Sequence, residues 1–311
     1  MQKMWIGRAR QAVAAVGLML ATGLSTAALV GMSAPRRALP TPVAPSDDSV
    51  DAVLPRLLGR SGKLRAIQAT PDGIRELPVV SSLFEGIDPE PGVHDLGLAT
   101  PSGESFFVVA LIPFQTKHGA RVDGYNIGFW PTERGRTSRY DLPEGFIQVT
   151  ADNQFTPLSE HFRLADFVTH DQQGVWPKML VIQPRLIDKL ELIAAELANV
   201  GKPSTLRIMS GFRTPQYNMR GVCRRCGRAK DSRHMYGDAA DILVDADGDG
   251  RMDDLDGDGR VNVRDARFLA AVAERVEAEH SDLIGGIGIY KPTRSHGPFV
   301  HVDARGFAAR W

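Results

Sequence analysis

His234 and Asp241 stand seven positions apart and have side chains that could bind one metal ion. Asp241 lies in the apolar run 239–244, which is typical of a buried strand. A carboxylate in a buried strand is costly unless it is paired or bound to a metal. The residues alone therefore leave two interpretations of Asp241: a metal ligand, or a carboxylate held by backbone N–H groups.

The segment around these two residues has the pattern Ser-x-His-x-x-Gly-x-Ala-x-Asp, from Ser232 to Asp241. It resembles the signature of the zinc D-alanyl-D-alanine carboxypeptidase family, which includes vancomycin-resistance dipeptidases, phage cell-wall endopeptidases and the zinc-binding Hedgehog signalling domain. Two more segments are similar to family motifs and occur in the family's order: Ser210-Gly211-Phe212-Arg213-Thr214-Pro215 with Asn218, and Phe299-Val300-His301-Val302-Asp303. The resemblance covers roughly residues 145–311.

This resemblance implies a zinc ion on His234, Asp241 and His301, with a fourth position open to water. It also assigns substrate binding to Arg213 and Ser232. Arg213 is expected on the loop after a strand at 206–209, where its forked donors could hold a carboxylate or carbonyl of the substrate. Without the resemblance, a solvated surface charge is the simpler interpretation of Arg213.

The other catalytic candidates lie in a strand expected at 298–304 or just before it. Period-two alternation places His301 and Asp303 on one face, so Asp303 is expected to orient His301 and is also a candidate general base. By itself, His301 could equally be a core histidine bonded to Asp303. Many family members have an acid three residues before the last zinc-binding histidine, where this chain has Pro298. His296 matches a catalytic histidine of some members and could move a proton near neutral pH.

Residues 245–265 contain two overlapping patterns of the calcium-loop type, each with a glycine at loop position 6. The oxygen ligands would be Asp245, Asp247, Asp249, Arg251 (its carbonyl), Asp253 and Asp256 in the first loop, and Asp254, Asp256, Asp258, Arg260 (its carbonyl), Asn262 and Asp265 in the second. Aspartate at position 12 resembles dockerin-type loops and thrombospondin-like repeats.

Because the two loops overlap at residues 254–256, either two ions share a carboxylate or only one loop is filled. We expect calcium here to be structural rather than catalytic. The alternative is a solvated acidic loop without an ion.

Cys223 and Cys226 are the only two cysteines of the chain. In an exported protein such a pair predicts a tight disulfide within the loop. A zinc site would need two more thiolates or histidines nearby, and a redox role would need a thioredoxin-like strand and helix around the pair.

The N-terminus predicts export, because basic residues precede an apolar segment at about 12–32. Residues 1–33 are interpreted as a signal peptide or membrane anchor, and residues 34–48 as a Pro- and Ala-rich linker. Residues 49–144 are expected to form a β-rich module of unknown role, in which His94 and His118 are ordinary surface histidines. The zinc peptidase domain would span 145–311, with the calcium-loop insertion at 245–265.

The fold class predicted for the catalytic part is α+β. A helix at 184–200 has Leu186, Leu190, Ile193 and Leu197 on one face, with Gly201 as its C-terminal cap. A second helix is expected at about 265–279, and further strands at 239–244 and 283–290. Together these elements predict a small antiparallel sheet flanked by helices and carrying the zinc site.

The sequence thus predicts an exported zinc-dependent peptidase, located in the periplasm or cell envelope. By resemblance, it hydrolyses amide bonds in peptidoglycan, either at a D-alanyl-D-alanine end or at an internal cross-link. One alternative is a calcium-dependent binding or scaffold protein on a catalytically degenerate peptidase fold, which Pro298 and the duplicated loop favour. Another is a peptidase that acts on proteins. A formal net charge of zero gives no reason to expect a nucleic-acid partner, and the oligomeric state is left open.

Overall fold

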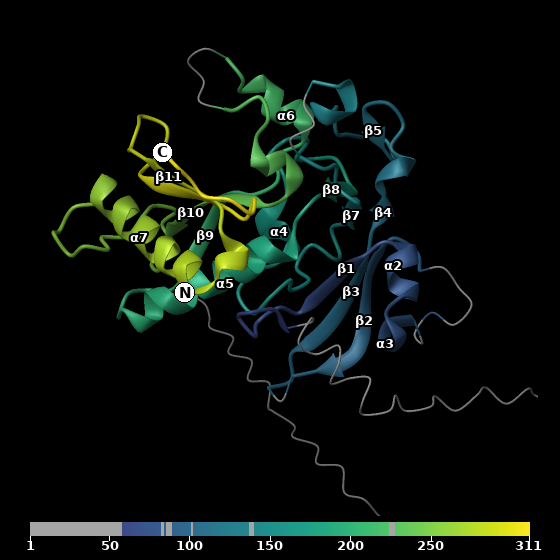
Figure 1. Cartoon of the computed structure of the whole chain (residues 1–311), viewed down its shortest axis with the longest axis horizontal. Coiled ribbons are helices and arrows are strands. Elements are labelled where there is room, and N and C mark those ends of the chain that lie inside the picture. The colour runs from purple at the N-terminus through teal and green to yellow at the C-terminus, as the bar shows by residue number, and fades with distance from the viewer. Residues whose placement is uncertain (1–57, 82–83, 85–88, 101, 137–139, 224–227) are drawn as a thin grey trace, which may run out of the picture. The chain divides into compact units, whose positions relative to one another are not determined.

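The computed structural model describes residues 58–311, apart from 82–83, 85–88, 101, 137–139 and 224–227 (Figure 1). The described residues all fall in the compact unit Pro45–Trp311. The predicted leader at 1–33 and linker at 34–48 lie outside them. Within the described residues, no helix is long and apolar enough to cross a membrane.

A five-stranded sheet forms the centre of the C-terminal part, with the strand order β13-β11-β12-β10-β9. Its strands are β9 (Leu206–Ser210), β10 (Ala239–Val244), β11 (Gly286–Tyr290), β12 (Phe299–Asp303) and β13 (Ala309–Arg310). All neighbours pair antiparallel except β11 and β13, which are parallel. The predicted α+β class with a small antiparallel sheet is therefore confirmed.

The strand expected from Leu283 begins only at Gly286. Leu283 belongs instead to the 3-10 turn η5 (Ser281–Leu283), which follows the helix α7 and buries that leucine.

Two long helices, α5 (Pro184–Asn199) and α7 (Val263–Glu279), pack against each other, and α7 also packs against β11 and β12 (Figure 1). The predicted apolar face of α5 is fully buried. Gly201 ends this helix in the left-handed region, at φ +70°, while the Lys202 N–H donates to the Leu197 carbonyl at 2.9 Å. This is the glycine cap that the sequence predicts.

The described residues before 145, together with two strands that follow them, form short strands and helices. A three-stranded sheet has the order β1-β3-β2, a second has the order β4-β7-β8, and β5 pairs with β6. Their bounds are β1 (Ala66–Ala69), α2 (Pro71–Arg75), α3 (Pro78–Ser81), β2 (Gly92–Ala99), β3 (Ser105–Ala110), β4 (Ile112–Pro113), η2 (Phe114–Thr116), β5 (Arg121–Val122), β6 (Tyr125–Asn126), η3 (Thr132–Arg134), β7 (Gly145–Val149) and β8 (Lys178–Leu180). Because β4 pairs with β7 and one hydrophobic cluster runs across residue 144, the domain boundary predicted there stays a prediction.

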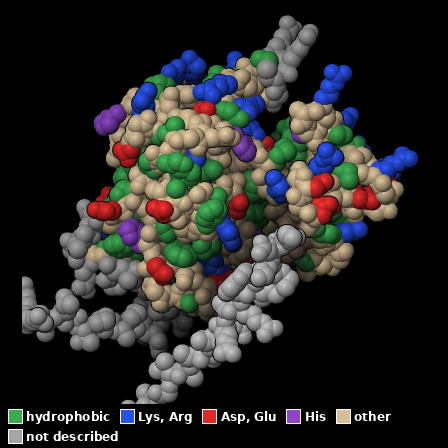
Figure 2. All heavy atoms as spheres, turned by 180° about the vertical axis from the view of Figure 1, so that it is seen from behind, with side chains coloured by type: hydrophobic (Ala, Val, Ile, Leu, Met, Phe, Trp, Pro, Cys, Tyr) green, Lys and Arg blue, Asp and Glu red, His purple; other side chains and the backbone are tan. Residues whose placement is uncertain are grey.

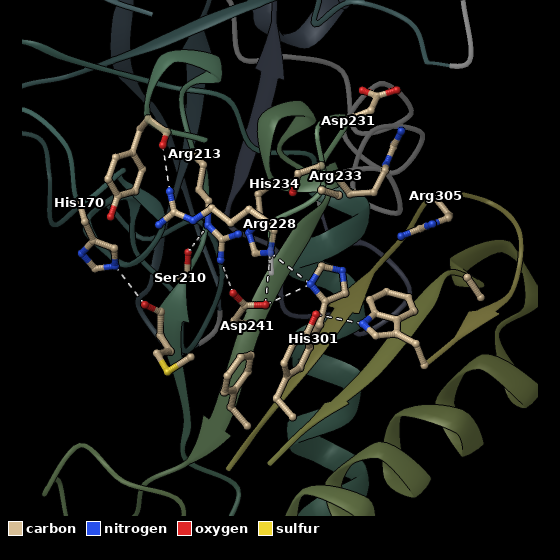
Figure 3. A pocket seen from close by; sticks show the side chains of 18 of the residues that line it. His170, Ser210, Arg213, Arg228, Asp231, Arg233, His234, Asp241, His301 and Arg305 are labelled. Carbon is tan, nitrogen blue, oxygen red and sulfur yellow. Dashed lines mark hydrogen bonds and ion pairs between the residues drawn. The ribbon is translucent and has the colours of Figure 1, made fainter. Parts of the chain in front are cut away.

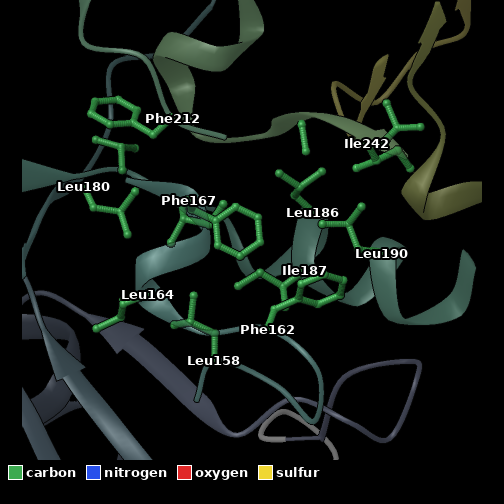
Figure 4. Packing of buried hydrophobic residues seen from close by; sticks show 14 of the residues in the cluster. Leu158, Phe162, Leu164, Phe167, Leu180, Leu186, Ile187, Leu190, Phe212 and Ile242 are labelled. Atoms are coloured by element: carbon green, nitrogen blue, oxygen red, sulfur yellow. The ribbon is translucent and has the colours of Figure 1, made fainter. Parts of the chain in front are cut away.

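The buried cluster beneath the sheet positions the loop that carries Arg213. Leu158, Phe162 and Phe167, the last at the end of α4 (Leu164–Phe167), pack with side chains of α5 and with Phe212 (Figure 4). A Cβ at Gly211 would lie 2.7 Å from Phe167 Cα, so only glycine allows this close approach. The Phe212 N–H donates to the Phe167 carbonyl at 2.9 Å, which fixes the backbone at the end of β9.

On the face shown in Figure 2, acidic and basic side chains are interspersed, in keeping with the formal net charge of zero.

Candidate metal centre

The three predicted ligands come from three neighbouring elements. His234 lies in the 3-10 turn η4 (Arg233–Tyr236), Asp241 in β10 and His301 in β12. Asp241 and His301 are direct partners in the antiparallel register of β10 and β12. Gly237 links η4 to β10 at φ +73°, where a Cβ would lie 2.5 Å from the Val181 carbonyl carbon. The glycine of the motif is therefore needed to return the chain into the sheet beside His234.

One donor atom of each ligand faces a common point (Figure 3). His234 Nε2 lies 3.1 Å from His301 Nδ1 and 3.2 Å from Asp241 Oδ1, and His301 Nδ1 lies 3.0 Å from Asp241 Oδ1. Ligands about 2.0 Å from a tetrahedral ion stand roughly 3.3 Å apart. The three side chains therefore fit a single metal ion of zinc size with little rearrangement.

Hydrogen bonds to the other ring nitrogens leave these donor atoms free for a metal. His234 Nδ1 donates to the Gly211 carbonyl at 2.7 Å, and His301 Nε2 donates to Asp303 Oδ2 at 3.1 Å. Each bond selects the tautomer whose remaining lone pair faces the metal position. Asp303 is held in turn by Arg305 and by the Gly286 N–H.

Behind Asp303, a buried ion pair fixes the end of β12. Lys189 of α5 bonds to Glu277 of α7 at 2.5 Å and donates to the Asp303 carbonyl at 2.7 Å. Burial lowers the pKa of Lys189, although Glu277 opposes that effect. The helices α5 and α7 thus hold the strand that carries His301.

Electrostatics within the cluster match its chemistry. Burial lowers the pKa of His234, which keeps the imidazole neutral as a metal ligand. Burial opposes ionisation of Asp241, but His234, His301 and Arg213 hold the pKa of this carboxyl well below its ordinary value. Burial also disfavours the charged form of His301, but bonds to Asp241 and Asp303 outweigh it and raise the pKa of this imidazole. Asp241 is therefore held as a carboxylate that faces both imidazoles, which suits it to binding a metal ion.

Arg213 and Ser232 both line the pocket above this cluster, which has a volume of about 910 Å³. Arg213 Nε donates to Ser210 Oγ at 2.9 Å, and Nη2 bonds to Asp241 Oδ2. The predicted substrate-binding arginine is therefore beside a metal-ligand candidate rather than free in solvent.

Several pocket residues were not singled out from the sequence. Arg228, Arg233 and Arg305 line the same pocket, as do Tyr140 and Asp231. Arg233 occupies a variable position of the Ser232–Asp241 pattern and the others lie outside the motifs, so only the folded chain shows that they share this pocket.

An aromatic wall lies across from these charges in the same pocket. Tyr290 and Phe299 stack at 4.4 Å, and Trp311 packs against His301 at 5.1 Å. A Cβ at Gly288 would lie 2.4 Å from the Trp311 ring, so this glycine makes room for the indole.

The two candidate proton carriers are placed differently. His296 lines the pocket, packs edge-on against Phe299 and donates from Nδ1 to the Gly297 carbonyl at 2.8 Å. Asp303 is fully buried behind His301 and does not line the pocket. The geometry suits Asp303 to orienting His301, and a proton-transfer role for His296 stays a prediction.

In the acidic segment, Asp245, Asp247 and Asp249 form one group, and Asp254, Asp256 and Asp265 form another. Both loops show the same internal bond, in which the glycine at position 6 donates to the aspartate at position 1. These bonds are Gly250 N–H to Asp245 Oδ2 at 3.1 Å and Gly259 N–H to Asp254 Oδ2 at 2.7 Å. Asp256, claimed by both predicted loops, gathers with the second group.

The other predicted calcium ligands make contacts within the protein. Asp253 accepts from the Ala246 N–H, Asp258 pairs with Arg264, and Asn262 caps α7 while bonding to the Arg260 carbonyl. Met252 and Leu255 are buried in the main core and anchor the segment between its charges. Calcium binding here, including a contribution from the Arg251 carbonyl, stays a prediction. Cys226 lies outside the described residues, so the Cys223–Cys226 disulfide is also still a prediction.

Comparison with known proteins adds one match. Residues 160–254 match the family model described as Peptidase M15. No match was found among curated proteins or among solved structures. The matched segment contains Arg213, His234 and Asp241 and ends before His301, which the fold brings to the same point. This segment of the chain is therefore similar to the peptidase M15 family.

Proposed function

We propose that this protein is an exported zinc peptidase that hydrolyses amide bonds in the stem peptides or cross-links of peptidoglycan. The observation that carries this proposal is the convergence of three donor atoms, 3.0 to 3.2 Å apart, at one wall of a large pocket in a chain with a segment similar to the peptidase M15 family. Export rests on the basic and apolar N-terminal segment of the sequence.

His234, Asp241 and His301 would hold the zinc ion. When bound, zinc supplies Lewis-acid polarisation of a carbonyl and lowers the pKa of a bound water toward about 7. Two neutral imidazoles and one carboxylate leave such a site net positive, which suits that chemistry. The chain's own contribution is rigidity, because Gly211 and Asp303 fix both imidazoles before any substrate arrives.

Substrate positioning falls to Arg213. Its Nε and Nη2 are engaged by Ser210 and Asp241, so its Nη1 is left to donate to a substrate carbonyl or carboxylate. Ser232 is buried and lines the same pocket. A substrate amide would therefore lie between Arg213 and the metal position.

His296 is the proposed proton carrier. Because its Nδ1 donates to the Gly297 carbonyl, its Nε2 keeps a lone pair that can accept a proton in the pocket. This histidine would take over the task for which many family members have an acid at the position of Pro298.

The proposal includes calcium in the segment 245–265. The repeated bond from the position-6 glycine to the position-1 aspartate supports the calcium-loop register in both loops. The second loop ends at Asp265, which also caps α7, so an ion there would stabilise the start of the helix that packs on β11 and β12.

The decisive experiment compares the wild type with His301→Ala and with His118→Ala as a matched control. His118 is exposed and does not line the pocket. Metal content is measured on each purified protein, and hydrolysis is followed by chromatography of purified peptidoglycan. We expect stoichiometric zinc and hydrolysis in the wild type and the control, with both lost in His301→Ala.

Each alternative gives a different result. Calcium without zinc and no hydrolysis would support a binding or scaffold protein. Cleavage of unfolded protein substrates, with peptidoglycan left intact, would support a protein peptidase.

A further inference from the structure

Arg228 differs from the other arginines of the metal-site pocket. Arg213 pairs with Asp241, Arg233 with Asp238 and Arg305 with Asp303. Among the described residues, Arg228 has no carboxylate within ion-pair distance, although it lines the same pocket (Figure 3). Among the described residues, Arg228 is therefore the arginine of this pocket whose charge no carboxylate neutralises.

Arg228 is nevertheless held in place. Its Nη1 donates to the Tyr217 carbonyl of α6 (Pro215–Arg220) at 2.9 Å, and its guanidinium lies over the Tyr217 ring at 4.5 Å. A Cβ at Gly221 would lie 2.2 Å from Arg228 Cδ, so the side chain crosses the end of α6 where only glycine leaves room. A half-buried arginine fixed by three contacts is preorganised for a ligand.

The free edge of this guanidinium has a defined chemistry. With Nη1 engaged by Tyr217, the parallel donors Nε and Nη2 remain, and this pair matches the two oxygens of a carboxylate. Among the described residues, the other three arginines that line the pocket are paired with carboxylates, so Arg228 is the one left to attract an anion. In addition, Asp241 would be neutralised by a bound metal ion.

We infer that Arg228 binds a free carboxylate of the peptide substrate and makes that carboxylate a requirement for tight binding. The inference rests on the proposed peptidase function and extends it to substrate selection. The carboxylate has two possible sources, the C-terminus of the peptide or a carboxylate on an internal residue. The first implies removal of a terminal residue, and the second implies cleavage within a longer chain or cross-link.

The test uses one stem peptide in three forms: unmodified, amidated at the C-terminus, and amidated at the internal carboxylate. KM and kcat are measured for the wild type, Arg228→Gln and Gly221→Ala. Gly221→Ala keeps every charge. Gly221 has a φ of −102°, which alanine can also adopt, but the new methyl group displaces Arg228. Arg267→Gln is the control, because Arg267 is exposed and lies outside the pocket.

For the wild type and the control, we expect amidation of the bound carboxylate to raise KM about 10- to 100-fold with kcat little changed, as for a lost hydrogen bond to a charged group. The form that shows the effect identifies the source. In Arg228→Gln and Gly221→Ala, KM for the unmodified peptide rises by the same factor and amidation has no further effect. Equal KM values for all three forms with the wild type, or discrimination that persists in Arg228→Gln, would overturn the inference.

Equilibrium binding separates this inference from the proposed function. The same peptides are titrated by calorimetry into the wild type stripped of metal and into Arg228→Gln stripped of metal. If the loaded wild type hydrolyses none of them, the proposed function fails, while a dissociation constant that depends on the carboxylate and on Arg228 still supports the subsite. If no form binds in a carboxylate-dependent way, the subsite is refuted as well.

Discussion

The metal-ligand cluster and the acidic segment both gather side chains that could bind a metal ion, but they are built on opposite principles. His234, Asp241 and His301 are buried, come from separate elements, and each imidazole is fixed by a partner outside the cluster. The acidic segment is mostly exposed, and its aspartates accept hydrogen bonds from their own loop. The first arrangement needs the whole fold, and the second needs only about twenty neighbouring residues.

This difference separates the roles of the two regions. A buried cluster with its donor atoms already converged loses little freedom when an ion binds, so its geometry suits chemistry. An exposed loop that satisfies its carboxylates locally gains order from an ion, which suits a structural role. Four substitutions or treatments test that contrast.

The largest effect is expected from Asp241→Asn compared with Asp247→Asn. Loss of a metal-ligand carboxylate should remove zinc and lower kcat/KM by about 1000-fold or more, since the metal contributes several kcal/mol to the barrier. Asp247→Asn, in the first acidic loop, should keep zinc and activity within about twofold. Metal analysis and peptide hydrolysis on the two proteins check this, and equal losses in both would erase the proposed distinction.

Calcium removal should come next, and it should act on stability rather than chemistry. An ion at 100 times its dissociation constant stabilises the folded state by about 2.7 kcal/mol. The melting temperature should therefore fall by roughly 5 to 10 °C when calcium is chelated, as monitored by circular dichroism. The Asp254→Asn variant, which lacks the first ligand of the second loop, serves as the comparison. Its melting temperature should fall less than that of the wild type when calcium is chelated. An unchanged melting temperature in the wild type would contradict the calcium assignment.

Asp303→Asn changes a residue that orients the candidate ligand His301, rather than a ligand itself. The neutral amide would leave Arg305 without its carboxylate and weaken the bond that orients His301. Zinc affinity or activity should fall about 10- to 100-fold, which is typical for residues that orient metal ligands. Competition with a chromogenic chelator measures the affinity. A wild-type affinity in this variant would show that β12 alone orients the imidazole.

The smallest effect is expected from Arg207→Ala, which removes an ion pair between the sheet and the acidic segment. Arg207 of β9 pairs with Asp245 at 2.9 Å, but its side chain is 52% exposed. The Asp245 side chain is only 3% exposed, but it keeps the hydrogen bond from the Gly250 N–H, so the free energy of unfolding should fall by about 1 kcal/mol. Urea denaturation gives this value, and zinc content should stay unchanged. A loss of zinc would mean that the acidic segment and the metal cluster are coupled through β9.

The three candidate ligands were predicted through the resemblance of their motifs to a known family, and only the spacing of His234 and Asp241 follows from local geometry. His234 and Asp241 are joined by a short turn into a strand, and the required Gly237 appears in the motif. Helix α5 and strand β10 were equally predictable, since a continuous apolar pattern and a glycine cap act over a few residues. The two overlapping calcium-loop patterns at 245–265 could also be found in the sequence, because each extends over only twelve neighbouring residues.

Only the tertiary structure decided which charges surround the metal position. Arg233 pairs with Asp238 and Arg305 with Asp303, in each case only a few residues away along the chain. The fold alone brings these two arginines and Arg228 to one pocket, where Arg228 has no carboxylate partner among the described residues. It also separated the roles of His296 and Asp303, by placing one in the pocket and the other behind His301. Ligand spacing is set by covalent geometry and hydrogen bonds a few residues long. The composition of a pocket, by contrast, is set by the packing of α5, α7 and the sheet as a whole.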